Sequence, residues 1–135
     1  MIEKSALFCL GALGYGCIEL AWRGRTHWTM LLAGGLCMLA LWALNERLGR
    51  WPLLARCAAG ALVITGVELA FGLVCNLALG WRVWDYSLLW GNLWGQICPL
   101  YSSLWFLLCI PIFGSLSLCR ARLDAPVAPG GGQEG

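Results

Sequence analysis

The chain has 135 residues, of which 60% are hydrophobic and only 12% are charged, and its formal net charge is +2. About a quarter of the residues in a typical soluble domain are charged. This composition therefore excludes an ordinary soluble domain and indicates a membrane protein.

Four apolar runs have approximately the length of a membrane span: Ser5–Trp22, Trp28–Leu44, Cys57–Leu79 and Ile97–Cys119. A spanning helix needs about 20 apolar residues, whereas a spanning strand needs only about 9–11. Only helices and closed barrels span a bilayer, and these runs are too long and continuous for strands. We therefore expect an all-α membrane protein with four transmembrane helices, arranged as two hairpins.

The first hairpin consists of a helix that ends near Trp22, the polar turn Arg23–His27, and a helix over about Trp28–Asn45. The basic loop Glu46–Pro52 leads into the second hairpin, and its terminal proline favours the start of a helix. The third helix is then expected over about Leu53–Leu79.

The next segment is too long for a single span, because no charged residue lies between Tyr86 and Cys119. A helix of that length would be about 51 Å long, and the hydrocarbon core is only about 30 Å thick. We expect an interfacial or re-entrant segment over about Trp81–Trp94, followed by the last helix over about Gln96–Leu118. The aromatic residues of this segment fit either an aromatic belt at the membrane surface or a lid over a polar cavity; they are Trp81, Trp84, Tyr86, Trp90 and Trp94.

Residues 1–123 are expected to form one four-helix transmembrane domain. The remainder, Asp124–Gly135, is rich in proline and glycine. Such a segment buries too little apolar area to order itself, so we expect a flexible tail.

The sequence lacks the motifs of several enzyme classes. The only lysine is Lys4, which excludes a P-loop ATPase. The only histidine is His27, which excludes the histidine-based zinc motifs, and no Gly-x-Ser-x-Gly elbow is present. We expect no catalytic residues, no metal and no cofactor. The eight cysteines lie almost entirely in apolar runs, where we expect them to pack as small apolar residues, with a redox or metal role as the alternative.

Two carboxylates lie in apolar runs with similar local sequences, Ile18-Glu19-Leu20-Ala21 and Val67-Glu68-Leu69-Ala70. A carboxylate in hydrocarbon costs roughly 2.5–3.5 kcal/mol on insertion scales, so these side chains should face the interior of the bundle. A lined pathway for a substrate or ion would use the polar residues Glu68, Glu19, Asn76, Asp85, Asn92 and Gln96, with Arg23, Arg25 and Arg82 as charge partners. The alternative is a structural polar network, in which Glu68 is protonated or paired with an arginine and Glu19 serves as a brace.

The placement of basic residues predicts the orientation in the membrane. With a cytoplasmic N-terminus, the inner segments hold Lys4, Arg47, Arg50, Arg56, Arg120 and Arg122, and the outer segments hold Arg23, Arg25 and Arg82. The positive-inside rule then favours both termini on the cytoplasmic side.

Small residues predict close helix packing. Gly91-x-x-x-Gly95 and Gly66-x-x-x-Ala70 fit the pattern that allows helices to approach in lipid. Because four short helices enclose little volume, we expect a homo-oligomer. The lipid bilayer is the expected partner, and no nucleic acid is expected.

The segment Trp84-Asp85-Tyr86-Ser87, followed by Gly91-Asn92-Leu93-Trp94-Gly95-Gln96-Ile97-Cys98, resembles the signature of the bacterial membrane family described as "putative ABC-transporter type IV" (CmpB-like). Gly14-Tyr15 with Glu19, and Gly66 with Glu68, fit the same family, and the resemblance covers roughly residues 11–106. It implies a multi-pass permease component of the bacterial cytoplasmic membrane. ATP hydrolysis would then come from a separate ATPase subunit.

Three hypotheses follow. In the first, the protein moves a small solute or ion, with Glu68 as the central polar group. In the second, it is an accessory or structural membrane protein whose buried polar groups only fix helix packing. In the third, it is an intramembrane enzyme or lipid-binding protein that uses Glu68 and Asp85 as an acid/base pair, which requires both carboxyls close to one substrate atom.

Overall fold

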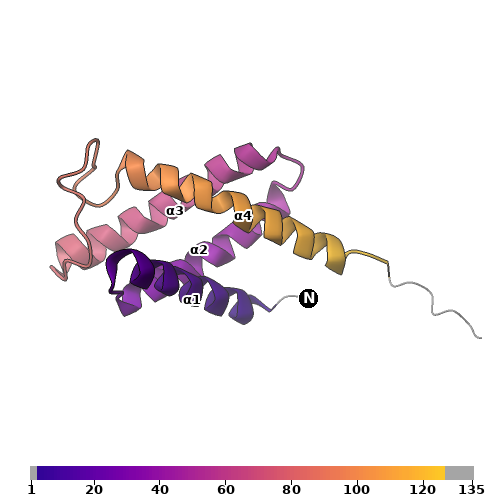
Figure 1. Ribbon diagram of the computed structural model, residues 1–135, viewed down its shortest axis with the longest axis horizontal. Coiled ribbons are helices and arrows are strands. Elements are labelled where there is room, and N and C mark those ends of the chain that lie inside the picture. Colours follow the sequence, from indigo (N-terminus) through magenta and orange to yellow (C-terminus); the bar gives the residue numbers. More distant parts are fainter. Residues whose placement is uncertain (1–2, 127–135) are drawn as a thin grey trace, which may run out of the picture.

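The computed structural model describes residues 3–126, and in that part of the chain it is entirely helical apart from turns and one long connector (Figure 1). The elements are α1 (Lys4–Arg23), α2 (Trp28–Arg47), α3 (Leu53–Phe71), the π-helix η1 (Gly72–Ala78) and α4 (Pro99–Leu123). With α3 and η1 forming one continuous span, the protein has four helices that are long and apolar enough to cross a membrane. The predicted all-α membrane fold is confirmed.

The helices form two hairpins that are joined through α2. Helix α1 packs closely only against α2, whereas α3 packs against both α2 and α4. The turn after α1 and the connector 79–98 lie at one end of the bundle, and the loop 48–52 lies at the other end with the start of α1 and the end of α4 (Figure 1). Because α1 has no close backbone contact with α4, a gap between these two helices is left for side chains to line.

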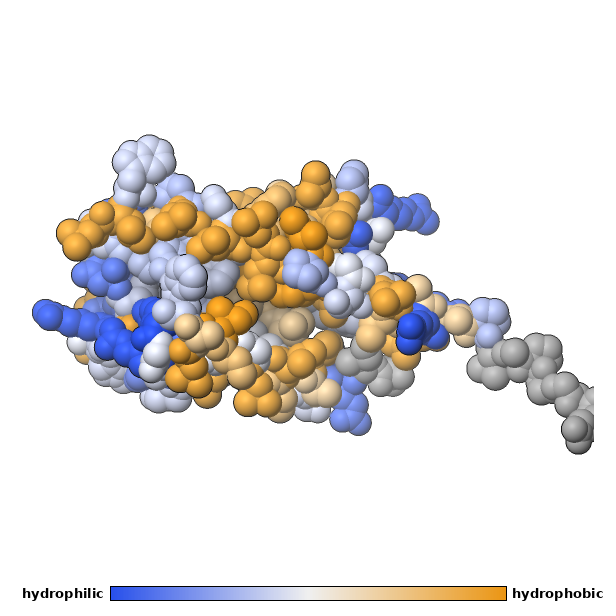
Figure 2. Space-filling view, viewed as in Figure 1, coloured by the Kyte–Doolittle hydropathy of each residue, from blue (hydrophilic) through white to orange (hydrophobic). Residues whose placement is uncertain are grey.

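Polar and apolar residues are sorted along the bundle as a membrane requires. Figure 2 shows apolar side chains along the middle of one face, with the most hydrophilic side chains towards its two ends. From the bounds of the helices, Arg23, Arg25 and Arg82 lie at the connector end, and Lys4, Arg47, Arg50, Arg56, Arg120 and Arg122 lie towards the other end, which are the two groups that the sequence predicts. Which group faces the cytoplasm stays a prediction.

Glycines set the close approach of α1 and α2. A Cβ atom added at Gly11 would lie 2.5 Å from the carbonyl oxygen of Gly34, and one added at Gly34 would lie 2.8 Å from the carbonyl oxygen of Gly11. A Cβ atom at Gly35 would lie 2.5 Å from the ring of Phe8. The two backbones therefore touch, as small residues allow in membrane helices.

The apolar core lies between α2, α3 and α4. Its most deeply buried side chains are Leu41, Cys57, Cys109 and Phe113. The eight cysteines are all free, and four of them are buried. Cys57 and Cys109 fill this core as small apolar residues, in agreement with the packing interpretation of the cysteines.

The third span changes geometry near its end. The peptide N–H of Leu79 donates to the carbonyl of Val74 over 2.9 Å, and that of Trp81 donates to the carbonyl of Cys75 over 2.9 Å. These wide turns close the C-terminal end of η1, which replaces the last turns of the regular helix expected to Leu79. π-helical turns often occur at functional segments.

The connector 79–98 is a compact loop with its own backbone hydrogen bonds. Tyr86 N–H donates to the Gly95 carbonyl over 2.7 Å, and Leu93 N–H donates to the Ile97 carbonyl over 2.9 Å. The last helix therefore starts later than predicted, at Pro99 rather than near Gln96, because Gln96 is held in this loop.

The two glycine motifs expected to pack helices lie in different surroundings. Gly91 and Gly95 have φ values of 68° and 70°, so they form turns and are not a helix-packing motif, which corrects the prediction. Gly66 lies in α3 with open space around it, and its role between protomers stays a prediction. Beyond Pro126, the predicted tail lies outside the described residues.

We predict that Gly34→Leu strongly destabilises the protein, because the new side chain must push apart two backbones in contact. Overpacking costs typically 1–3 kcal/mol, and we expect a loss of about 3 kcal/mol here. Thermal unfolding in nanodiscs, followed by circular dichroism, measures the effect. Gly114→Leu is the matched control, since it adds the same side chain to an exposed position of α4 where nothing lies within 4 Å. Equal melting temperatures for the two variants would contradict the contact.

Candidate functional site

Glu68 is the centre of a buried polar site at the connector end of the bundle. Its side chain is 6% exposed. One carboxylate oxygen accepts a hydrogen bond from the Tyr86 hydroxyl over 2.6 Å, and the other accepts one from Trp105 Nε1 over 3.0 Å. Because Tyr86 belongs to the connector and Trp105 to α4, the carboxylate joins three segments of the chain.

Tyr86 is suited to remain a hydrogen-bond donor. Burial, together with the neighbouring Glu68 carboxylate, raises the pKa of the Tyr86 hydroxyl well above its ordinary value. The hydroxyl therefore stays protonated and keeps donating to Glu68.

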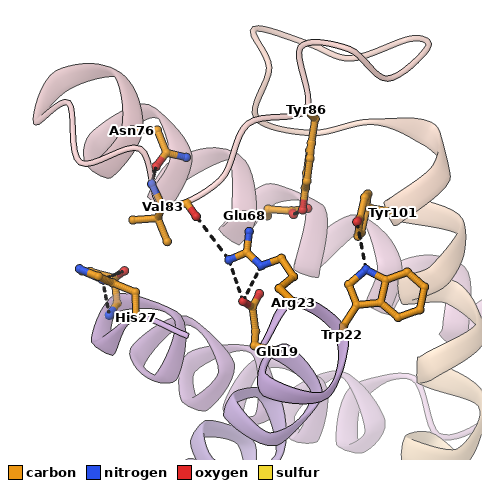
Figure 3. A network of polar contacts seen from close by, with 10 residues as sticks. Glu19, Trp22, Arg23, His27, Glu68, Asn76, Val83, Tyr86 and Tyr101 are labelled. Atoms are coloured by element: carbon orange, nitrogen blue, oxygen red, sulfur yellow. Dashed lines mark hydrogen bonds and ion pairs between the residues drawn. The ribbon is translucent and has the colours of Figure 1, made fainter. Parts of the chain in front are cut away.

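Glu19 and Arg23 form an ion pair in the last turns of α1. Arg23 Nη2 lies 2.7 Å from Glu19 Oε2, and Nε of the same guanidinium donates to that oxygen over 3.0 Å. Arg23 Nη2 also donates to the Val83 carbonyl over 3.3 Å, so the pair reaches the connector (Figure 3). The connector therefore contacts both Glu68, through Tyr86, and this ion pair, through the Val83 carbonyl.

Asn76 and Gln96 hold the connector against η1. The Asn76 side chain accepts a hydrogen bond from Val83 N–H over 2.7 Å and donates to Gln96 Oε1 over 2.8 Å. Trp84 Nε1 donates to the Gln96 carbonyl over 3.0 Å. The two amide side chains are 8% and 3% exposed, so they pair polar groups that would otherwise be buried alone.

Asp85 and Asn92 shape the connector from its outer side. Asp85 is exposed and accepts hydrogen bonds from the peptide N–H and the hydroxyl of Ser87, which hold the pKa of this carboxyl below its ordinary value. Asn92 donates to the Leu89 carbonyl over 2.9 Å and accepts from Gly95 N–H over 3.0 Å. Neither residue shares a partner with Glu68, so the geometry gives no support to an acid/base pair of Glu68 and Asp85.

The remaining predicted site residues lie on the surface. Arg25 and Arg82 are exposed, and neither has an ion-pair partner within residues 3–126. Trp81, Trp90 and Trp94 are 46%, 86% and 63% exposed, as belt residues would be, whereas Trp84 and Tyr86 turn inward. The connector therefore combines an outer aromatic surface with two inward anchors.

A cavity of about 220 Å³ opens between α1 and α4, and its lining includes Tyr86 and Trp105, the two residues that bond to Glu68. Tyr86 and Tyr101 are stacked with ring centroids 4.5 Å apart, and Trp22 Nε1 donates to the Tyr101 hydroxyl over 3.3 Å. Its polar and aromatic lining consists of Tyr15, Glu19, Trp22, Arg23, Tyr86, Tyr101 and Trp105.

A second cavity of about 380 Å³ continues along the same gap. It shares Tyr15, Ile18, Trp105 and Leu108 with the first cavity, and its other lining residues are almost entirely apolar. The gap between α1 and α4 is therefore polar and aromatic near the connector and apolar further along the bundle.

Sequence reasoning named Glu19 and Arg23 but missed the aromatic residues of α1 and α4 that line the first cavity, which are Tyr15, Trp22, Tyr101 and Trp105. Tyr15, Glu19 and Trp22 are spaced by four and three residues, and Tyr101 and Trp105 by four, which places each set on one helix face. This spacing of aromatic side chains with polar groups was the available signal.

A second polar cluster, at the opposite end of the bundle, was also missed. Arg56 Nη1 donates to Asn45 Oδ1 and to the Ser117 hydroxyl, each over 2.8 Å. These contacts join α2, α3 and α4. Within residues 3–126, no group of three His, Cys, Asp or Glu side chains is arranged to hold a metal ion.

We predict that Asn76→Leu loosens the connector, because it leaves Val83 N–H and the Gln96 amide without their partner. A buried polar group left unpaired costs about 1–3 kcal/mol. The melting temperature should fall, and chymotrypsin should cleave faster at the exposed Trp90. Leu77→Ala, at an exposed neighbouring position in η1, is the control. Unchanged cleavage of Asn76→Leu would show that Asn76 does not anchor the connector.

Comparison with known proteins agrees with this architecture. Neither the search of curated proteins nor that of solved structures gives a match. A family model described as "Putative ABC-transporter type IV" matches residues 7–122, which include all four helices and the connector. On this match the chain belongs to that family of membrane proteins related to ABC transporters.

Proposed function

We propose that the protein is the membrane component of a transporter and that a small solute binds in the cavity between α1 and α4, with Glu68 as its central polar group. The observation that carries the proposal is the cavity itself. It holds the Glu19–Arg23 ion pair and several aromatic rings, and two of its lining residues, Tyr86 and Trp105, bond to the buried carboxylate of Glu68. Ionisable residues at such positions are rare, and they commonly mark pathways for substrates or ions.

The connector is suited to respond to a bound solute. It is attached to the bundle through Tyr86 on Glu68, through Val83 on Asn76, and through the Val83 carbonyl on Arg23. A solute that bonds to Glu68 or Arg23 would replace one of these contacts. Binding would then favour a released connector, as a ligand shifts a conformational equilibrium only through different contacts in the two states. In this proposal the connector is the lid.

The second candidate function is an accessory membrane protein in which Glu68 only braces the helices. It is favoured by the two hydrogen bonds that satisfy both carboxylate oxygens. A buried acceptor with a full set of donors is what a structural network requires. The cavity favours the first candidate, because a brace alone needs no adjoining space.

The family also suggests partners and a location. If a separate ATPase subunit drives transport, it would bind at the cytoplasmic end. With both termini cytoplasmic in a bacterial inner membrane, that end carries a polar hollow between the loop 48–52 and the end of α4. A second copy of the chain would have the exposed face around Gly66 and Ala70 available.

We predict that Glu68→Gln abolishes solute binding while the helical fold persists. A panel of small cations, anions, zwitterions and neutral solutes is added to protein in nanodiscs, and melting temperatures are recorded. A solute at about 100 times its Kd stabilises a protein by about 2.7 kcal/mol. At least one solute should stabilise the wild type and not Glu68→Gln. Glu46→Gln, at an exposed carboxylate outside the cavity, should keep the response.

The bracing alternative predicts a different outcome. Glu68→Gln would then lower the melting temperature without added solute, and no member of the panel would stabilise either protein. That result would overturn the proposed function.

A further inference from the structure

The first cavity has little to offer an anion. Arg23 is the only basic residue among those that line it, and its guanidinium already serves Glu19 and the Val83 carbonyl. A free anion would therefore meet no unpaired cation there, whereas a cation would meet the carboxylate of Glu19.

The aromatic lining favours the same kind of ligand. The polar edges of the rings are largely engaged within the protein: Trp22 donates to Tyr101, and Tyr86 and Trp105 donate to Glu68. A ligand in the cavity would therefore contact mainly the faces of these rings. A cation within about 6 Å of a ring centroid is attracted by the negative face, and quaternary ammonium groups are bound by aromatic cages in this way.

The second, apolar cavity extends the binding space beyond the aromatic cage, which consists of Tyr15, Trp22, Tyr86, Tyr101 and Trp105. It begins at Tyr15 and Trp105 and continues between α1, α2 and α4, past Gly14 and Pro111. A Cβ atom added at Gly14 would meet nothing within 4 Å. The two cavities together fall within the roughly 300–1,000 Å³ typical of ligand pockets.

We propose that the solute is an amphiphilic organic cation, with an ammonium-type head group in the aromatic cage and an apolar tail in the cavity between α1 and α4. The proposal rests on the proposed function, because it names the class of solute that binds at the same site. It follows from the neutralised Arg23, from the ring faces and from the apolar continuation, none of which suits a small anion or a strongly hydrated solute.

Two probes with the same tail test the charge of the head group. Radiolabelled decyltrimethylammonium and decyl sulfate are each added to protein in zwitterionic nanodiscs, and binding to empty nanodiscs is subtracted. The ammonium compound should bind saturably to the wild type, and the sulfate should not. Tyr101→Leu, which removes a ring of the cage, should weaken ammonium binding by roughly 3- to 30-fold. Trp90→Leu, at an exposed ring on the connector, should not change it.

A third probe, tetramethylammonium, has no apolar tail and tests where the tail binds. Gly14→Leu, which fills the apolar cavity, should weaken binding of decyltrimethylammonium at least tenfold and leave binding of tetramethylammonium unchanged. Gly114→Leu, also in open space but outside both cavities, is the control. Circular dichroism shows whether each variant keeps its helices.

The outcomes separate this inference from the proposed function. Saturable binding of decyl sulfate, or of a different solute from the panel with no response to the ammonium probes, would overturn the amphiphilic cation and leave the proposed function in place. Equal effects of Gly14→Leu and Gly114→Leu would overturn the position of the tail. Absence of binding by every probe and every panel member would overturn both.

Discussion

The structure depends on the requirement that a polar group in hydrocarbon finds its partners within the protein. Glu68 meets this requirement with two donors from different parts of the chain, Tyr86 in the connector and Trp105 in α4. An isolated buried charge is costly, and a carboxylate that accepts well-placed hydrogen bonds is much less so. Through these two hydrogen bonds, the connector and α4 are both held against the third span. Asn76 and Gln96 extend the same logic, because they pair the backbone and amide groups that the connector brings inside.

The cavity is a consequence of how the first helix is attached. Glycines let α1 and α2 touch through their backbones, and α1 has no comparable contact with α4. Large aromatic side chains line the space between them without closing it. Near the connector the lining includes an ion pair and the donors that hold Glu68, and further along it is apolar. The space between α1 and α4 is therefore polar at one end and apolar at the other. It exists because α1 packs tightly against α2 and not against α4.

The spans and the long connector could be predicted from sequence, because length and hydropathy determine what a bilayer accepts. The inward position of Glu68 and the pairing of Glu19 with Arg23 follow from the cost of burying charge and from helical spacing. The turn conformation of Gly91 and Gly95 could not be predicted, since the same spacing on a helix would be a packing motif. Nor could the roles of Asp85 and Asn92, because whether a polar side chain bonds to its own loop or to a distant helix depends on tertiary contacts. Tyr101 and Trp105 were overlooked because aromatic residues in an apolar span do not differ from lipid-facing ones by composition.

The most direct measurement is a side-chain-resolution structure of the protein in a lipid nanodisc. Our account predicts that the Glu68 carboxylate lies within hydrogen-bond distance of the Tyr86 hydroxyl and Trp105 Nε1, and that aromatic side chains line an open space between α1 and α4. A structure in which α1 packs directly on α4, with Glu68 bonded to neither residue, would contradict it.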